Sequence, residues 1–199
     1  MFKKLALILM SVTALAVTGV QAGGHSKDRD KTVIFDVDGG KIAQPYNFNY
    51  LVPGTNRNQG IHQAVWEPLF ILNYESGKID SWLGDSFVAN ANSDVWTLNL
   101  KKGIKWHDGQ DLDADDVVFT IQMLMNDKTG TLNYAAAMQQ WIKEVKKQDK
   151  HTVVFTLTEP NPRFQLDYFS VKIWGGVVIM PEHVWQGQDP YTFKFYDKE

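Results

Sequence analysis

The sequence predicts a mixed fold of helices and strands, of the α/β (mixed α+β) class. Residues 96–100 and 153–157 each alternate apolar and polar side chains, as strands with one buried face do. Residues 114–125 carry apolar side chains at spacings of three and four, the pattern of an amphipathic helix. The turns between these segments favour hairpins over a regular β-α-β alternation.

The elements expected in the first half are short. In chain order they are a strand at 32–37, a loop at 41–59, a short helix at about 61–67, a strand at 69–73 and the strand at 96–100. The loop contains Pro45, Pro53 and Gly54 and shows no periodicity. Long loops of this kind are often binding loops, which makes it a candidate site.

The second half begins with turns at Lys102-Gly103 and Asp108-Gly109. The elements expected there are a return strand at 104–106, the helix at 114–125, a loop at 127–136, a helix at 135–147, the strand at 153–157, an apolar run at 177–180 and a short helical stretch after Pro181.

Composition indicates an exported protein with a packed core. The chain has 199 residues, of which 44% are hydrophobic and 22% charged, and it has no cysteine. A basic start, an apolar run from Leu5 to Val17 and small residues up to Ala22 predict a signal peptide over 1–22. The alternative is a membrane anchor, but the run is shorter than the roughly 20 residues a span needs. A soluble periplasmic protein is expected, because no cysteine could carry a lipid anchor.

Charge argues against nucleic acid as a partner. Removing residues 1–22 removes two lysines and no acid, which takes the net charge from −3 to −5. An acidic balance of this size disfavours binding to phosphate backbones or to anionic membranes.

Five aspartates lie between residues 108 and 116, where they suggest a metal site or an acid–base centre. Asp111, Asp113 and Asp115 match positions 1, 3 and 5 of an EF-hand loop, but Asp116 and Gln122 replace the required Gly and Glu. The histidines are scattered and form no zinc motif. The sequence therefore predicts no metal site.

The same aspartates suit the start of the helix at 114–125. Asp113 is placed to be its N-cap, and Asp115 and Asp116 fall in the first turn, where negative charge favours the helix dipole. Asp108 belongs to a turn, and Asp111 is expected to be a solvated loop charge. The sequence shows no nucleophile motif and no phosphate loop, so no catalytic residue is predicted. A secreted hydrolase using Glu67 or His107 stays open as an alternative.

A family resemblance rests on residues 96–124, which read WTLNLKKGIKWHDGQDLDADDVVFTIQML. This stretch resembles the signature of the bacterial extracellular solute-binding proteins of family 5, the dipeptide, oligopeptide and nickel binding proteins of ABC importers. The matching residues are Trp96, Thr97, Leu98, Leu100, Lys102, Gly103, Lys105, His107, Asp108, Gly109, Ala114, Asp116, Val117, Val118 and Phe119. Asp113 stands where the family has Thr, and Trp106 where it has Phe. Flanking stretches at 65–87, 151–164 and 179–185 are also similar.

The resemblance implies a periplasmic binding protein-like fold of type II, in which two lobes enclose the ligand. It implies a first segment of lobe I at 30–64, an inserted subdomain at 65–159 and a return to lobe I at 160–199. Members of the family are much longer, so we expect the chain to be their N-terminal part, with lobe II absent.

The resemblance also implies a ligand, with peptide expected first and oligosaccharide as the alternative. Nickel is less favoured because no histidine cluster is present. The ligand-binding residues it suggests are Asn56, Arg57, Asn58, Gln59, Trp66 and Tyr134. Arg57 could hold a ligand carboxylate with two hydrogen bonds. The expected partners are the permease subunits of an ABC transporter. The protein is expected to be a monomer without a cofactor.

Overall fold

The computed structural model describes residues 47–53, 65–171 and 175–194. The chain divides into two units, Met1–Ile34 and Phe35–Glu199, and every described residue belongs to the second. The predicted signal peptide and the predicted strand at 32–37 lie outside the described residues. Within the described part, no helix is both long and apolar enough to cross a membrane.

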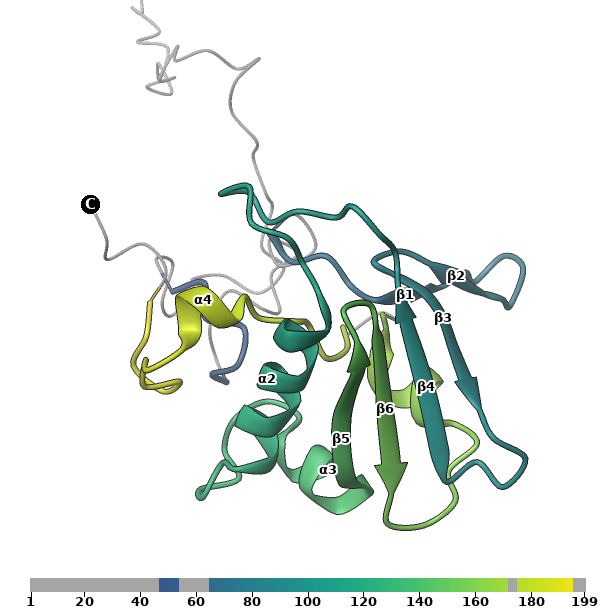
Figure 1. Ribbon diagram of the computed structural model, residues 1–199. Coiled ribbons are helices and arrows are strands. Elements are labelled where there is room, and N and C mark those ends of the chain that lie inside the picture. Colours follow the sequence, from purple (N-terminus) through teal and green to yellow (C-terminus); the bar gives the residue numbers. More distant parts are fainter. Residues whose placement is uncertain (1–46, 54–64, 172–174, 195–199) are drawn as a thin grey trace, which may run out of the picture. The chain divides into compact units, whose positions relative to one another are not determined.

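A four-stranded antiparallel sheet forms the centre of the described unit (Figure 1). Its strands are β3 (Gly84–Ala89), β4 (Val95–Leu100), β5 (Ile142–Asp149) and β6 (Thr152–Leu157), in the order β3-β4-β6-β5. Strands β4 and β6 pair at the centre and turn every second side chain towards the core. This alternation is what the sequence predicted for 96–100 and 153–157, and both predictions are confirmed.

A second sheet has three short strands: β1 (Phe70–Leu72), β2 (Ile79–Ser81) and β7 (Ser170–Val171). Strand β1 lies between β2, its antiparallel partner, and β7, its parallel partner. The chain passes from β2 into β3 through Gly84, whose backbone N–H donates to the carbonyl of Leu69 at 3.0 Å. A Cβ on Gly84 would lie 2.4 Å from Cζ of Phe70. A glycine is therefore required where the two sheets meet.

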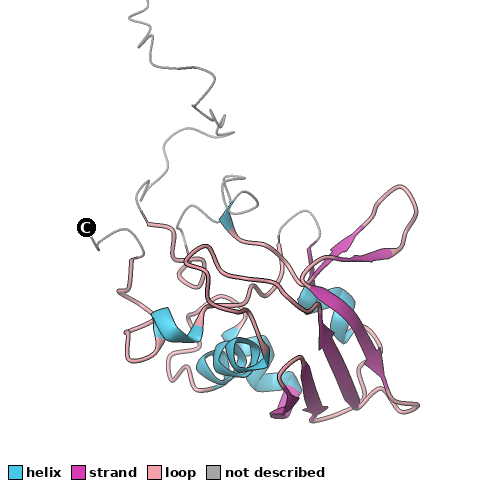
Figure 2. Cartoon of the chain, turned by 45° about the horizontal axis from the view of Figure 1, so that its top comes forward, coloured by secondary structure: helices cyan, strands magenta, loops and turns pink. Residues whose placement is uncertain are grey.

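Helices cover the buried face of the four-stranded sheet (Figure 2). They are α2 (Ala114–Met125), α3 (Ala135–Trp141) and the π-helical turn η3 (Gln165–Phe169), while the short α4 (Glu182–Trp185) packs against α2. Val117, Ile121 and Leu124 of α2 are fully buried. The predicted helix at 114–125 is confirmed with the same bounds.

Aromatic rings fill the core between the sheets and the turn η3. Phe87 of β3 is at its centre and contacts five other rings with centroid distances of 5.2–6.2 Å: Phe70, Trp96, Phe155, Phe164 and Phe169. Edge-on and tilted pairs of this kind contribute beyond their buried area. The chain has no cysteine, so this cluster takes the place of a disulfide in holding distant segments together.

Two predictions of secondary structure are wrong. The helix predicted over 135–147 ends at Trp141, because residues 142–149 pair with β6 as strand β5. Ile142 and Val145 are three residues apart, a helical spacing, but a shift of register between Ile142 and Glu144 turns both inward from a strand. The return strand predicted over 104–106 is absent and is represented by a single bridge between Lys105 and Asp111.

Other elements differ in extent or were not predicted. The predicted strand at 69–73 is confirmed in shorter form as β1, whereas β2, β3, β7 and η3 were not predicted. The helix predicted at 61–67 lies mostly outside the described residues, and Trp66 and Glu67 are not helical. The short helix after Pro181 is confirmed as α4.

Candidate functional site

A groove of about 680 Å³ is the candidate site. Three segments border it: the loop 104–112, the stretch 179–184 that includes the start of α4, and residues within and after the predicted loop 41–59. Its lining residues are Phe48, Val65, Trp66, Glu67, Leu83, Ile104, Lys105, Trp106, His107, Leu112, Ile179, Pro181 and Val184. The lining is mostly apolar and aromatic, with a few polar groups, which is typical of small-molecule sites.

The first wall is shaped by a tight turn. The N–H of Trp106 donates to the carbonyl of Gln110 at 2.8 Å, and the N–H of Gly109 donates to the carbonyl of Trp106 at 2.9 Å. Gly109 has φ +89°, a left-handed conformation that favours glycine. A carboxylate oxygen of Asp108 accepts the N–H of Gln110 at 3.1 Å. The prediction of a turn at Asp108-Gly109 is confirmed, and the turn sets Trp106 and His107 into the lining.

The second wall is the segment 179–184. His183 Nε2 lies 2.7 Å from Oδ2 of Asp108, so the outer edge of this wall is tied to the loop of the first wall. The hydrogen bond from His183 lowers the pKa of Asp108 below its usual value, with help from the N–H of Gln110. Both side chains are about a third exposed or less, so this contact lies at the edge of the groove.

The third side includes the segment 47–53, the described part of the predicted binding loop 41–59. Trp66 donates its indole N–H to the carbonyl of Phe48 at 3.3 Å. On the other side of the segment, Asn133 donates to the carbonyls of Tyr50 and Leu51 at 2.8 and 2.7 Å. This part of the predicted loop is therefore held from two directions.

The predicted ligand-binding residues are only partly brought together. Trp66 lines the groove, whereas Tyr134 is not part of its lining and precedes α3 with φ 70°. Asn56, Arg57, Asn58 and Gln59 lie outside the described residues. Trp106 was not proposed as a site residue. The signal that could have found it is the apolar pair Ile104 and Trp106, two residues apart beside a turn, which points one face of an irregular segment inward.

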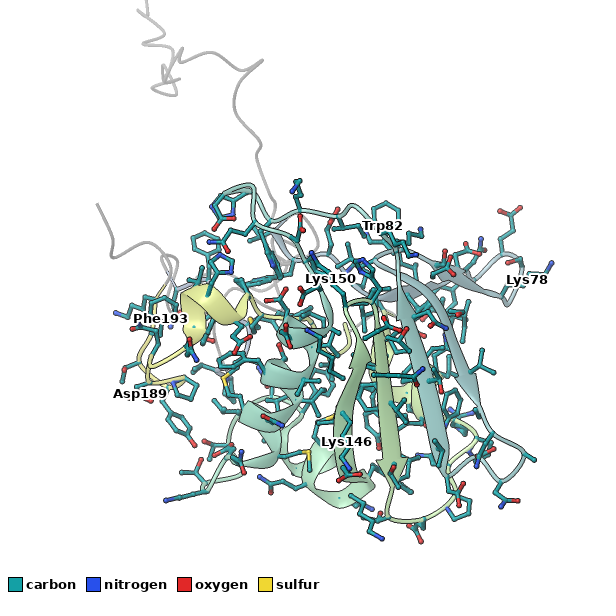
Figure 3. All side chains as sticks on the ribbon, in the orientation of Figure 1. Lys78, Trp82, Lys146, Lys150, Asp189 and Phe193 are labelled. Carbon is teal, nitrogen blue, oxygen red and sulfur yellow. The ribbon has the colours of Figure 1, made fainter. Side chains whose placement is uncertain are left out.

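The aspartate cluster begins α2, as the sequence predicted. Asp113 is the N-cap, and its carboxylate accepts the N–H of Asp115 at 2.8 Å, while Asp116 accepts the N–H of Asp113 at 3.0 Å. This is a reciprocal capping box. Asp111 is exposed, as predicted, but hydrogen bonds from Lys105 (2.6 Å) and Lys150 (2.8 Å) lower its pKa to about 2. Lys150, in the turn between β5 and β6 (Figure 3), lies beside the start of α2, where its carbonyl accepts the N–H of Ala114 at 2.9 Å.

Metal chemistry has no support in the described part of the chain. Among those residues, no group of three or more histidine, aspartate or glutamate side chains could hold a metal ion. The titratable groups in the groove lining are Glu67, Lys105 and His107, and Lys105 is already paired with Asp111. The groove is suited to binding apolar and aromatic groups beside a few charges.

These features describe a framework of sheet and helices that presents an aromatic groove. Residues 78–195 match the family described as bacterial extracellular solute-binding proteins, family 5, in its middle region. The chain belongs to this family, as its signature at 96–124 suggested.

Relatives and solved structures agree with this assignment. The chain is 29% identical over 183 residues to the dipeptide-binding protein of Escherichia coli K12, covering 82% of this chain and 31% of that protein. It superposes with a TM-score of 0.60 at 24% identity on the oligopeptide-binding protein AppA of Bacillus subtilis in complex with a nonapeptide, covering 76% of this chain and 28% of AppA. The mannohexaose-bound oligopeptide-binding protein of Thermotoga maritima gives a TM-score of 0.55 at 26% identity, with 76% and 26% coverage.

The mixed α+β fold is confirmed as part of the fold of family 5 periplasmic binding proteins. The chain spans about a third of the length of the dipeptide-binding protein. The relatives are substrate-binding proteins of extracellular or periplasmic type.

Proposed function

We propose that this chain belongs to the substrate-binding component of an ABC importer, which captures peptides in the periplasm and delivers them to the membrane permease. The observation that carries the proposal is the family match over 78–195. The similarity to a dipeptide-binding protein over 82% of the chain supports peptide as the ligand class. Because the chain spans a third of that relative, the ligand and the permease partner are proposals for the whole protein.

The groove supports peptide binding chemically. Its apolar and aromatic walls can bury side chains, while Glu67, Lys105 and His107 can face a ligand with two charged ends. Asn56, Arg57, Asn58 and Gln59 follow the anchored segment 47–53 within the same predicted loop. We assign these four residues, with Trp66 and Tyr134, to ligand binding.

The remaining proposals concern the organisation of the protein. Residues 1–22 act as a signal peptide, 30–64 and 160–199 belong to lobe I, and 65–159 form the inserted subdomain. The four-stranded sheet lies within 65–159, which supports that boundary. The three-stranded sheet connects β1 to β7 and links the inserted subdomain to the return segment. The protein works as a monomer without a cofactor and catalyses no reaction.

An oligosaccharide ligand is the second candidate. Trp66 and Trp106 line one groove, and tryptophan faces are well suited to stacking on sugar rings. The solved relative from Thermotoga maritima was crystallised with mannohexaose. A secreted hydrolase is a third and weaker candidate, supported by the presence of Glu67 and His107 in the same lining.

The test uses the protein expressed from its complete coding sequence. Thermal unfolding is measured with dipeptides, a nonapeptide and mannohexaose, and each ligand is then analysed for cleavage. A ligand at 100 times its Kd stabilises the folded state by about 2.7 kcal/mol. We expect a shift with peptides and intact ligand afterwards. A shift with mannohexaose alone would favour the sugar, and cleavage would favour the hydrolase.

Arg57→Ala tests the assigned loop. We expect peptide affinity to fall by at least tenfold, because a bidentate carboxylate contact is lost. Arg163→Ala is the matched control: Arg163 is exposed and pairs with Asp167 at 2.9 Å away from the groove lining. Equal affinity in the Arg57 variant and the control would remove Arg57 from the site.

A further inference from the structure

Asp116 is a buried carboxylate with partners in three separate segments. Only 5% of the surface of Asp116 is exposed to solvent. Oδ2 accepts the indole N–H of Trp106 at 3.1 Å and the backbone N–H of Asp113 at 3.0 Å. Oδ1 accepts the backbone N–H of Glu182, the first residue of α4, at 2.8 Å.

Capping of α2 explains one of these three contacts. The bond from the N–H of Asp113 belongs to the capping box of the helix. The other two reach Trp106 in the loop 104–112 and Glu182 in the segment 179–184, the two segments that form opposite walls of the groove. A helix cap needs neither of them.

Burial makes this arrangement costly, which indicates that the carboxylate has a further role. Removing a carboxylate from water costs several kcal/mol unless donors replace the water. Burial raises the pKa of Asp116 even though Glu182, Asp113 and Trp106 all donate to it. A carboxylate has two oxygens and about four acceptor positions, whereas an amide side chain has a single acceptor oxygen. Among side chains of this length, aspartate alone can receive all three N–H groups.

A second contact one turn along α2 supports the same geometry. Thr120 Oγ1 accepts the N–H of Met180 at 2.8 Å and donates to the carbonyl of Asp116 at 2.8 Å. Helix α2 thus holds the segment 179–182 at two successive points, as the neighbouring positions of α2 and α4 in Figure 1 illustrate. The pair between Asp108 and His183 closes the outer edge of the same two walls.

We propose that Asp116 is a positioning residue of the binding groove: its carboxylate fixes the indole of Trp106 on one wall and the start of α4 on the other, and so sets the width and aromatic surface that a ligand meets. This inference rests on the proposed function for its effect on binding. Its effect on Trp106 does not depend on any ligand.

The test compares Asp116→Asn with two controls in the protein expressed from its complete coding sequence. Asp113→Ala removes the N-cap side chain of α2 and leaves the contacts to Trp106 and Glu182 in place. Asp115→Asn changes an adjacent exposed carboxylate, which pairs with Lys147. The readouts are the indole N–H resonance of Trp106, identified by its loss in Trp106→Phe, and the Kd for the peptide that binds most tightly.

In Asp116→Asn we expect the Trp106 indole resonance to shift and its hydrogen exchange to accelerate by at least tenfold, with a Kd at least tenfold weaker. Asp113→Ala should lower the unfolding temperature without changing the resonance or the Kd.

If Asp116→Asn fails to fold, Trp106→Phe decides, because this variant removes the indole donor while keeping an aromatic ring. A Kd of Trp106→Phe within twofold of the wild type would then overturn the proposal. An unchanged indole resonance in folded Asp116→Asn would also overturn it. A wild-type protein that binds no peptide would refute the proposed function and leave the resonance to decide the role of Asp116.

Discussion

Gly84 lies where the chain leaves one sheet and enters the other, and replacing it with alanine tests how tightly this junction is packed. The added Cβ would lie 2.4 Å from Cζ and 2.7 Å from Cε2 of Phe70. Phe70 is 2% exposed and stacks on Phe87 at a centroid distance of 6.2 Å, so its ring has little room to move. Overpacking of a core by one methyl group costs about 1–3 kcal/mol. For a chain of this size, each kcal/mol lowers the unfolding temperature by about 2–4 °C.

Urea and thermal unfolding measure this cost. We expect Gly84→Ala to lower the unfolding midpoint with an unchanged m-value, since the folded state is strained and the unfolded chain is hardly altered. Gly84→Ala combined with Phe70→Leu should lose less stability than the sum of the two single changes, because the smaller side chain removes the clash. Equal stability of Gly84→Ala and the wild type, or strict additivity in the double variant, would refute the packing derived for this junction.

The remaining predictions concern the cap of α2, the loss of stability at low pH and the aromatic core. Asp113→Ala should destabilise the protein by about 1 kcal/mol and Asp113→Ser by much less, because serine also caps a helix; urea midpoints that fall equally would contradict the cap. Burial opposes ionisation of Asp127, but hydrogen bonds from Tyr191, Leu132 and Thr129 outweigh it and lower the pKa from 3.8 to about 2. The stability that Asp127 contributes is therefore complete above pH 4 and lost as the pH falls through 2, and Asp127→Asn should flatten a plot of stability against pH between those values. Phe87→Ala should cost about 3–5 kcal/mol, and an intact near-ultraviolet dichroism spectrum at 37 °C would argue against its central place in the core.

The sequence predicted those elements whose caps and apolar patterns lie within the element itself. The helix 114–125 carries both its N-cap, Asp113, and its apolar stripe within a dozen residues, and its bounds are confirmed. Strand β5 was predicted as a helix because Ile142 and Val145 have helical spacing. The register shift that turns both inward depends on pairing with β6, and this pairing is not encoded within residues 142–149 themselves. A strand whose periodicity is changed by a bulge is therefore misread wherever its partner is unknown.

The same reasoning separates what could be predicted of the site from what could not. Asp116 could be assigned from the sequence to the first turn of a helix, because that role involves neighbours three residues away. Its bonds to Trp106 and to the N–H of Glu182 join segments 10 and 66 residues distant, and no spacing rule relates them. Trp106 was predicted only as part of a return strand at 104–106, and the segment 179–184 that forms the opposite wall lies more than 70 residues away along the chain. The carboxylate of Asp116 thus completes the capping box of α2 by accepting one N–H. Through its other two contacts it joins the two walls of the groove. Local patterns identify such a residue, but only the folded chain shows which of its contacts determine the shape of the site.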